Sequence, residues 1–126
     1  MKYKRLNENF LREFEAYNFS LIKEKKIGLV GSTRFRDYFL KIESILQILH
    51  KKLVSICSVD GLFNKEKFSY DEWEALQRIC IEKLRDQEAI LVLDIEGYIG
   101  DHTSEEIEFF LESLKKPVYY LSKLKK

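Results

Sequence analysis

Residues 89–106 decide the fold, and they read Ala-Ile-Leu-Val-Leu-Asp-Ile-Glu-Gly-Tyr-Ile-Gly-Asp-His-Thr-Ser-Glu-Glu. The apolar run 89–93 has the length and composition of a strand buried on both faces. A glycine-containing loop follows, and then the polar start of a helix. A buried strand that passes through such a loop into a helix is a typical ligand site of an open α/β sheet.

The segments on either side alternate between strand and helix patterns. Three further short apolar runs predict strands, at residues 27–30, 53–57 and 117–121. Apolar residues that recur every three or four positions predict helices over 34–50, 70–86 and 103–114. Between them, we expect residues 58–69 to form a loop, with Asp60-Gly61 as its turn signal.

The apolar positions of the two later helices predict which side faces the sheet. In the helix over 70–86, the expected inner residues are Trp73, Leu76, Ile79, Cys80 and Leu84. In the helix over 103–114, they are Ile107, Phe110, Leu111 and Leu114.

Strictly alternating strands and helices imply right-handed crossovers and a parallel sheet covered on both faces. We therefore predict an α/β fold, a flavodoxin-like three-layer sandwich of about four strands in the order 2-1-3-4. In that order, the switch point lies between the first and third strands. The loops that follow these strands, 31–34 and 94–104, are then expected to face each other across one crevice.

Length and composition indicate a globular protein with one main domain. The chain has 126 residues and a net charge of +1, so no nucleic-acid polymer is expected as a partner. No apolar run approaches the length of a membrane span, and the two cysteines fit a reducing cytoplasm. They form no zinc pattern with the histidines, and we expect neither a metal nor a cofactor.

Residues 1–26 are predicted to be an N-terminal helical extension to an α/β domain over 27–126. Leu6, Phe10, Phe14 and Tyr17 share one helical face, which favours a short helix packed on the outside of the main unit.

The first loop, Gly31-Ser32-Thr33-Arg34, permits two interpretations. Free amides at a helix start, two hydroxyls and a guanidinium suit a phosphate or another anion. In the alternative interpretation, Ser32 or Thr33 caps the helix and Arg34 lies on the surface.

The second loop carries carboxylates whose role is also open. Thr103 and Glu106 have the spacing of a capping box, in which they bind amides at the helix start. Alternatively, Glu106 lies in the crevice near the positive end of the helix dipole, which keeps it ionised as a nucleophile requires. Asp94 and Asp101 would join it in a carboxylate cluster that divides the acid and nucleophile roles.

Two neighbours complete this loop. Tyr98 either stacks on a flat ligand ring or packs on the loop itself. His102 is expected to be an exposed loop residue.

At these residues, the chain resembles the nucleoside 2-deoxyribosyltransferase-like superfamily, which includes small bacterial and phage members. The resemblance covers about residues 27–121. Its matching pieces are Gly31-Ser32-Thr33-Arg34-Phe35, Gly97-Tyr98-Ile99-Gly100, Thr103-x-x-Glu106-Ile107 and Lys116-Pro117-Val118-x-x-Leu121.

The resemblance implies cleavage or transfer at the N-glycosidic bond of a deoxynucleoside or its 5′-monophosphate. Glu106 matches the family's catalytic glutamate, and Asp94 or Asp101 would assist departure of the base. Gly31, Ser32 and Arg34 match the loop that holds the 5′-phosphate. Thr33, Tyr98, Gly100 and Thr103 complete the expected ligand site. Family members are commonly oligomeric, so the resemblance also allows a homo-oligomer.

Two departures from the family pattern favour an alternative, a module of the same fold that binds a nucleotide or nucleotide-derived ligand without turning it over. Gly28 stands where the nucleotide-hydrolysing branch carries a tyrosine. That branch's further aspartate aligns near Cys80 or Glu82. A third hypothesis is a structural or interaction protein that uses its aromatic N-terminal helix.

Overall fold

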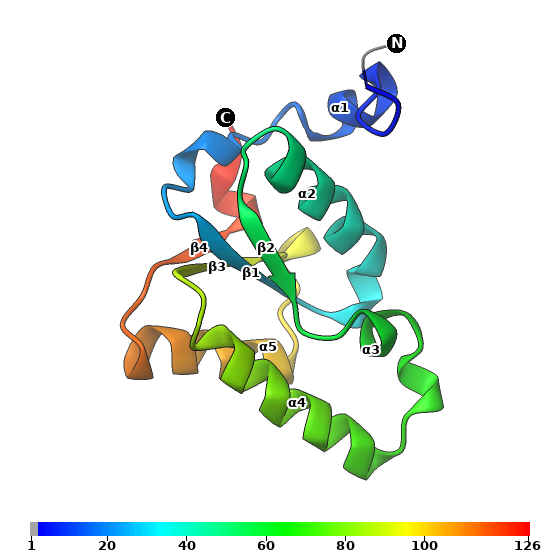
Figure 1. The fold of residues 1–126 in the computed structure, drawn as a ribbon, viewed down its shortest axis with the longest axis vertical. Helices are drawn as coiled ribbons and strands as arrows, with labels where there is room; N and C mark the ends of the chain where they lie inside the picture. Colours follow the sequence, from blue (N-terminus) through cyan, green and yellow to red (C-terminus); the bar gives the residue numbers. More distant parts are fainter. Residues whose placement is uncertain (1–2) are drawn as a thin grey trace.

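The computed structural model describes residues 3–126 and contains a four-stranded parallel sheet with helices on both faces (Figure 1). The strands are β1 (Lys26–Val30), β2 (Leu53–Ile56), β3 (Ala89–Val92) and β4 (Val118–Tyr120). They lie in the order β2-β1-β3-β4, and each neighbouring pair is parallel. The predicted α/β class, three-layer arrangement, strand order and N-terminal helix are confirmed.

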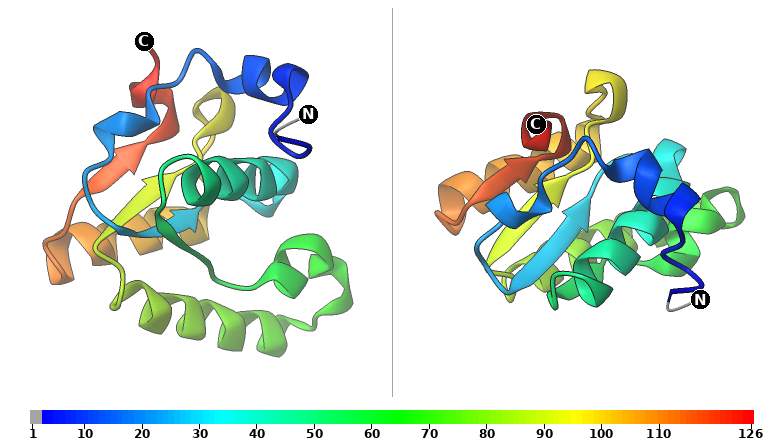
Figure 2. Two further views of the ribbon diagram at one scale, coloured as in Figure 1. Left: turned by 45° about the horizontal axis from the view of Figure 1, so that its top comes forward. Right: turned by 90° about the horizontal axis from the view of Figure 1, so that it is seen from above.

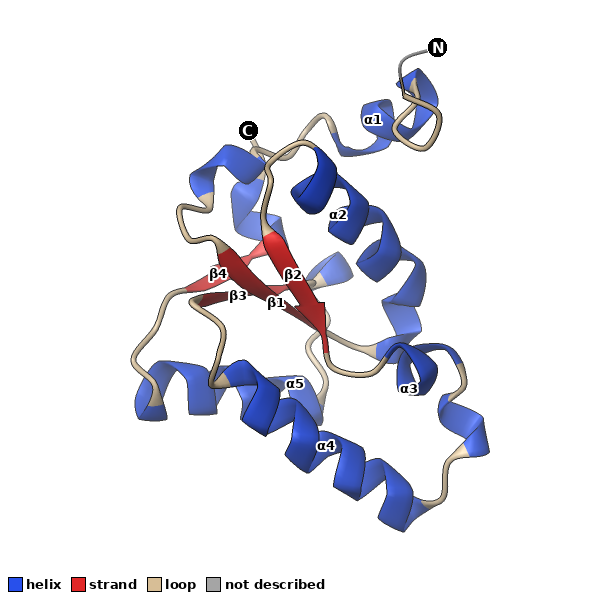
Figure 3. Ribbon diagram, in the orientation of Figure 1, coloured by secondary structure: helices blue, strands red, loops and turns tan. Residues whose placement is uncertain are grey.

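The two faces of the sheet are covered by different helices, as Figure 3 shows. On one face, α1 (Glu8–Phe14) and α2 (Arg36–Ile48) pack over Ile27 and Leu29 of β1. On the other face, α4 (Tyr70–Leu84) and α5 (Asp101–Glu108) pack over Val30. Successive residues of a strand point to opposite faces, so β1 contributes to both apolar cores.

The most deeply buried part of the sheet is β3. Each residue from 89 to 93 has an exposed fraction of 0%. A strand covered on both faces needs apolar residues at every position, which explains why this run does not alternate with polar residues.

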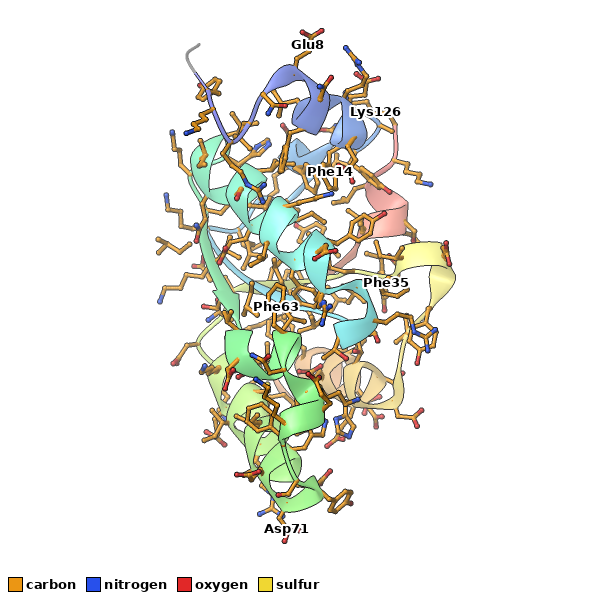
Figure 4. All side chains as sticks on the ribbon, turned by 90° about the vertical axis from the view of Figure 1, so that its right-hand side faces the viewer. Glu8, Phe14, Phe35, Phe63, Asp71 and Lys126 are labelled. Carbon is orange, nitrogen blue, oxygen red and sulfur yellow. The ribbon has the colours of Figure 1, made fainter. Side chains whose placement is uncertain are left out.

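The N-terminal extension contributes to the same core as the sheet. Leu6, Phe10 and Phe14 are buried in one cluster with Ile27 of β1. The backbone N–H of Lys126 donates to the carbonyl of Ala16 at 2.8 Å, which ties the C-terminus to the extension. Figures 2 and 4 show the first helix and the end of the chain on the same side of the molecule.

The loop predicted for residues 58–69 is wrong in part. It contains a short helix, α3 (Val59–Phe63), and one turn of 3-10 helix (Lys65–Lys67). The Ser58 hydroxyl caps α3 by accepting from the N–H of Gly61 at 3.0 Å. Gly61 serves close packing as well as turning, because a Cβ there would lie 3.1 Å from the Trp73 ring.

Two apolar residues predicted to face inward are largely exposed. Ile79 of α4 is 51% exposed, whereas Cys80 and Leu84 of the same helix are buried. Beyond α5, the chain continues as a π-helical turn over Phe109–Ser113. A π turn holds more residues than an α turn and shifts the phase of the helix. Leu111 is consequently 48% exposed, while Phe110 is fully buried.

This phase shift predicts unequal effects for two adjacent truncations. We expect Phe110→Ala to lower the free energy of unfolding by about 3–5 kcal/mol, because it empties a fully buried aromatic site. Leu111→Ala is the matched control and should cost less than about 1 kcal/mol. Urea unfolding of both variants measures the difference, and equal losses would contradict the observed phase.

Candidate functional site

A cavity of about 390 Å³ opens at the carboxyl ends of β1 and β2. Sites for small molecules commonly occupy about 300–1,000 Å³, so this volume fits a ligand of nucleoside size. Its lining comes from residues 29–33, residues 56–58, α3, α4 and residues 98–106, with Phe39 of α2 and Lys65 in addition. The loops after β1 and β3 therefore share one crevice, as the strand order predicted.

The first loop is held close to the end of β3. A Cβ on Gly31 would lie 3.2 Å from the Cβ of Leu93, so only glycine fits here without displacing the strand. Gly31, Ser32 and Thr33 line the cavity. The Ser32 hydroxyl accepts from the N–H of Arg34 at 3.1 Å and so caps the 3-10 turn Thr33–Phe35, whereas α2 itself begins after Phe35 with no side-chain cap.

Arg34 is exposed and lines a depression beside the mouth of the cavity, not the cavity itself. Its guanidinium carbon lies 4.1 Å from the centre of the Tyr98 ring, a cation–π contact between the two loops. Tyr98 also meets Phe35 edge-on, with ring centres 6.1 Å apart. Packing on the loops is therefore confirmed for Tyr98, whose side chain also lines the cavity.

Basic residues gather beside this mouth, and the sequence analysis did not identify two of them. Arg34, Arg36 and Lys65 line a neighbouring depression, and Lys65 and Thr33 border both hollows. Lys65 comes from the segment predicted to be a loop. Only the positions of α3 and the following 3-10 turn bring it to Arg34.

The second loop turns sharply before α5. Glu96 and Gly97 have positive φ angles of 56° and 75°, which reverse the chain after β3. Gly100 is the N-cap residue of α5, so the helix begins at Asp101 and not at residue 103 as predicted. His102 therefore lies in the first helical turn, half-buried, with Nε2 3.9 Å from a carboxylate oxygen of Glu74. The loop position predicted for His102 is wrong, whereas its predicted exposure is largely confirmed, because 40% of the side chain is exposed.

The capping-box interpretation of Thr103 and Glu106 is also wrong. Because α5 starts two residues earlier, neither side chain lies at the helix start, and α5 has no side-chain cap hydrogen bond. Thr103 is 3% exposed and Glu106 is 6% exposed, and both line the cavity. Glu106 thus has no capping role that would account for its burial.

The environment of Glu106 makes it titrate near neutral pH. Burial raises the pKa of its carboxyl to about 7, and the nearby charge of Glu105 acts in the same direction. The Cys57 thiol opposes this shift by donating to Oε2 at 3.9 Å. A carboxyl group with such a pKa changes its charge within the physiological range.

The structure does not gather the three predicted carboxylates into one cluster. Asp101 lies at the exposed rim of the cavity. Asp94 is buried and is not among the described residues that line the cavity. Both of its carboxylate oxygens accept from Ser122, one from the N–H at 2.9 Å and one from the hydroxyl at 2.5 Å. The contact of Asp94 with Ser122 joins the end of β3 to the segment after β4.

Two cysteines from different elements lie next to each other at the cavity wall. Cys57 follows β2, Cys80 lies in α4, and both line the cavity beside Glu106. Hydrogen bonding to Cys80 and burial raise the pKa of the Cys57 thiol well above its usual range. No sequence pattern joins these three residues, because 23 positions separate the cysteines and a further 26 lead to Glu106.

Comparison with models of known protein families, with curated proteins and with solved structures finds no match to this chain. Within residues 3–126, no helix combines the length and apolarity needed to cross a membrane.

The raised pKa predicts that Glu106→Gln stabilises the protein at alkaline pH. The ordinary pKa of 4.5 applies to the unfolded chain, and the folded value is about 7. The contribution of Glu106 to the free energy of unfolding is therefore fully present below pH 4.5. It is lost as pH rises through 7, by about 3 kcal/mol in total. A neutral amide escapes this loss. We expect the free energy of unfolding of Glu106→Gln to be higher than that of the wild type at pH 8 and similar to it at pH 4.

Thermal and urea unfolding across this pH range measures the effect. Glu105→Gln is the matched control, because Glu105 is the exposed neighbour on the same helix. Its stability should follow the wild-type pH dependence closely, because the charge of Glu105 is the smallest contribution to the raised pKa of Glu106. A Glu106→Gln variant that is less stable than the wild type at pH 8 would mean that the carboxylate has a stabilising partner.

Proposed function

We propose that the cavity binds a deoxynucleoside or its 5′-monophosphate and that Glu106 attacks the anomeric carbon. The supporting observation is the position of Glu106, a buried carboxyl group at the wall of a nucleoside-sized cavity with no capping role. The resemblance of residues 31–35, 97–100 and 103–107 to the nucleoside 2-deoxyribosyltransferase-like superfamily supplies the class of reaction.

The proposed reaction has two displacements. The ionised Glu106 carboxylate forms a bond to the anomeric carbon while the glycosidic carbon–nitrogen bond breaks. The base leaves with the bonding electrons and takes up a proton. Water, or a nitrogen of a second base, then attacks the same carbon and releases Glu106. Two inversions retain the configuration of the sugar, as in retaining glycosidases.

We assign Asp101 as the general acid that gives a proton to the departing base. It lines the cavity, whereas Asp94 is engaged by Ser122. The basic group at the mouth, Arg34, Arg36 and Lys65, suits a 5′-phosphate, since guanidinium and ammonium groups bind phosphate oxygens through charge-assisted hydrogen bonds.

A second candidate function is binding without turnover. A side chain at position 28 has no room, because a Cβ on Gly28 would already lie 3.2 Å from Leu84. The tyrosine of the nucleotide-hydrolysing branch thus has no counterpart on this strand. The position near its aspartate holds Cys80, a thiol that lines the cavity. These departures favour a module that holds the ligand without cleaving it.

Release of free base distinguishes the two candidates. We expect incubation with a panel of deoxynucleosides and 5′-monophosphates to release base in the wild type, detected by liquid chromatography. Glu106→Gln should retain binding and lose turnover, because an amide is a poor nucleophile. Binding without base release by the wild type would favour the binding module. Undiminished turnover by Glu106→Gln would remove the nucleophile assignment.

The pH dependence of the reaction follows from the same carboxyl group. Glu106 must be ionised to attack, and its pKa in the folded protein is about 7. We therefore expect kcat/KM to rise between pH 6 and pH 8 with a midpoint of about 7. A rate that falls over this range would indicate that Glu106 acts in its protonated form, as a general acid.

Arg34 provides a test of the phosphate position. Arg34→Ala removes a charge-assisted hydrogen bond, which commonly contributes about 1.5–3 kcal/mol. We expect binding of a 5′-monophosphate to weaken by about tenfold to a hundredfold, with little change for the unphosphorylated nucleoside. Arg12→Ala is the control, because Arg12 carries the same charge but pairs with Glu8 on α1. Equal losses for both ligands would contradict a phosphate contact.

A further inference from the structure

The two cysteines and Glu106 form a compact set of metal-ligand atoms. The Sγ atoms of Cys57 and Cys80 and a carboxylate oxygen of Glu106 all lie within 4.8 Å of one another. Cys57 is the first residue after β2, Cys80 lies in α4 and Glu106 lies in α5. Cys80 and Glu106 are buried, and Cys57 is half-buried.

These distances suit tetrahedral zinc. Zinc binds thiolates at about 2.3 Å and carboxylates at about 2.0–2.2 Å, which sets neighbouring ligand atoms about 3.6–3.8 Å apart. Cys57 Sγ and Glu106 Oε2 are already 3.9 Å apart. Side-chain movements on the order of 1 Å bring all three atoms to one ion.

We propose that Cys57, Cys80 and Glu106 bind a zinc ion as its three protein ligands, with the fourth position open to the cavity. All three side chains line the cavity, so a water molecule or a ligand atom has access to the ion. Zinc sites with three protein ligands and one open position are the common catalytic arrangement.

The charge balance of the site is favourable. Binding releases the protons of the two thiols, and that of the Glu106 carboxyl group where it is protonated, and the ion with its three ligands carries one negative charge. Lys83 lies close to this charge, since its ammonium group donates to the carbonyl of Cys57.

Zinc and the proposed nucleophile exclude each other, a consequence that rests on the proposed function. A carboxylate that ligates zinc is not free to attack the anomeric carbon. Zinc would then inhibit glycosyl transfer, and a chelator would restore it. Metal binding itself is measured without any nucleoside, so its result does not depend on whether the protein is an enzyme.

Cobalt titration of the fully reduced protein tests the site directly, because Co²⁺ bound by thiolates absorbs in the near ultraviolet. The chain has two cysteines and both belong to this set, so the absorption reports on no other site. We expect one ion per chain, displacement of Co²⁺ by zinc, and a higher melting temperature of the wild type with zinc.

Variants identify the ligands. Changes to outer partners of a metal site cost about tenfold to a hundredfold in affinity, so loss of a direct ligand in Cys57→Ser or Cys80→Ser should cost more than about a hundredfold. Glu106→Gln should weaken binding, and the neighbouring Glu105→Gln should not. Circular dichroism verifies that each variant is folded.

Three results would overturn the proposal. These are a wild type without thiolate-to-cobalt absorption, a wild type whose melting temperature zinc leaves unchanged, and a folded Cys57→Ser/Cys80→Ser double variant that binds zinc as tightly as the wild type. If metal binding is confirmed but no nucleoside is cleaved, the zinc site stands and the glycosidic function fails. If base release continues unchanged with the site saturated by zinc, Glu106 is not both ligand and nucleophile.

Discussion

The parallel pairing of β1 with β3 is the constraint on which the rest of the structure depends. Ile27 to Val30 pair with Ala89 to Val92, although the two strands are about sixty residues apart in sequence. This pairing places both strand ends, and the loops that follow them, at one edge of the sheet. The adjacent strand β2 ends at the same edge and adds Cys57 to it.

A parallel sheet covered on both faces leaves little room for polar side chains. Among residues 3–126, the buried polar side chains are Gln87, Asp94, Thr103 and Glu106, and each has a hydrogen bond or lines the cavity. Among the described residues, no buried side-chain nitrogen or oxygen lacks a hydrogen-bond partner. The two buried carboxyl groups differ in the strength of their hydrogen-bond donors. Asp94 accepts from the N–H and the hydroxyl of Ser122, whereas Glu106 accepts from the Cys57 thiol at 3.9 Å. A weakly solvated carboxyl group at a cavity wall is costly for stability and suited to chemistry.

Several functions compete for the same few atoms. In the two proposals above, the carboxyl group of Glu106 either attacks a sugar or shares a metal ion with two thiols. Both roles require an ionised Glu106, whereas only metal binding requires deprotonated Cys57 and Cys80. The protonation state of the two thiols therefore separates the two proposals.

The amino-acid sequence by itself determined the fold class, since short apolar runs that alternate with segments of helical period 3.6 permit few arrangements besides a covered parallel sheet. It also located the two loops that border the cavity. Element boundaries were less well determined. For example, α5 starts at Asp101 after the N-cap residue Gly100, two residues before the apparent capping box.

Only the tertiary structure decided the contents of the site. No sequence spacing relates Cys57, Cys80 and Lys65 to Glu106. They line one cavity because β2, α3 and α4 meet at the same edge of the sheet. Asp94 and Asp101 looked equivalent in sequence, but Ser122, from the segment after β4, binds the first and leaves the second at the rim. Local periodicity reports which face of an element is buried. Which side chains meet there depends on contacts between residues far apart in the chain, and the sequence pattern carries no record of those contacts.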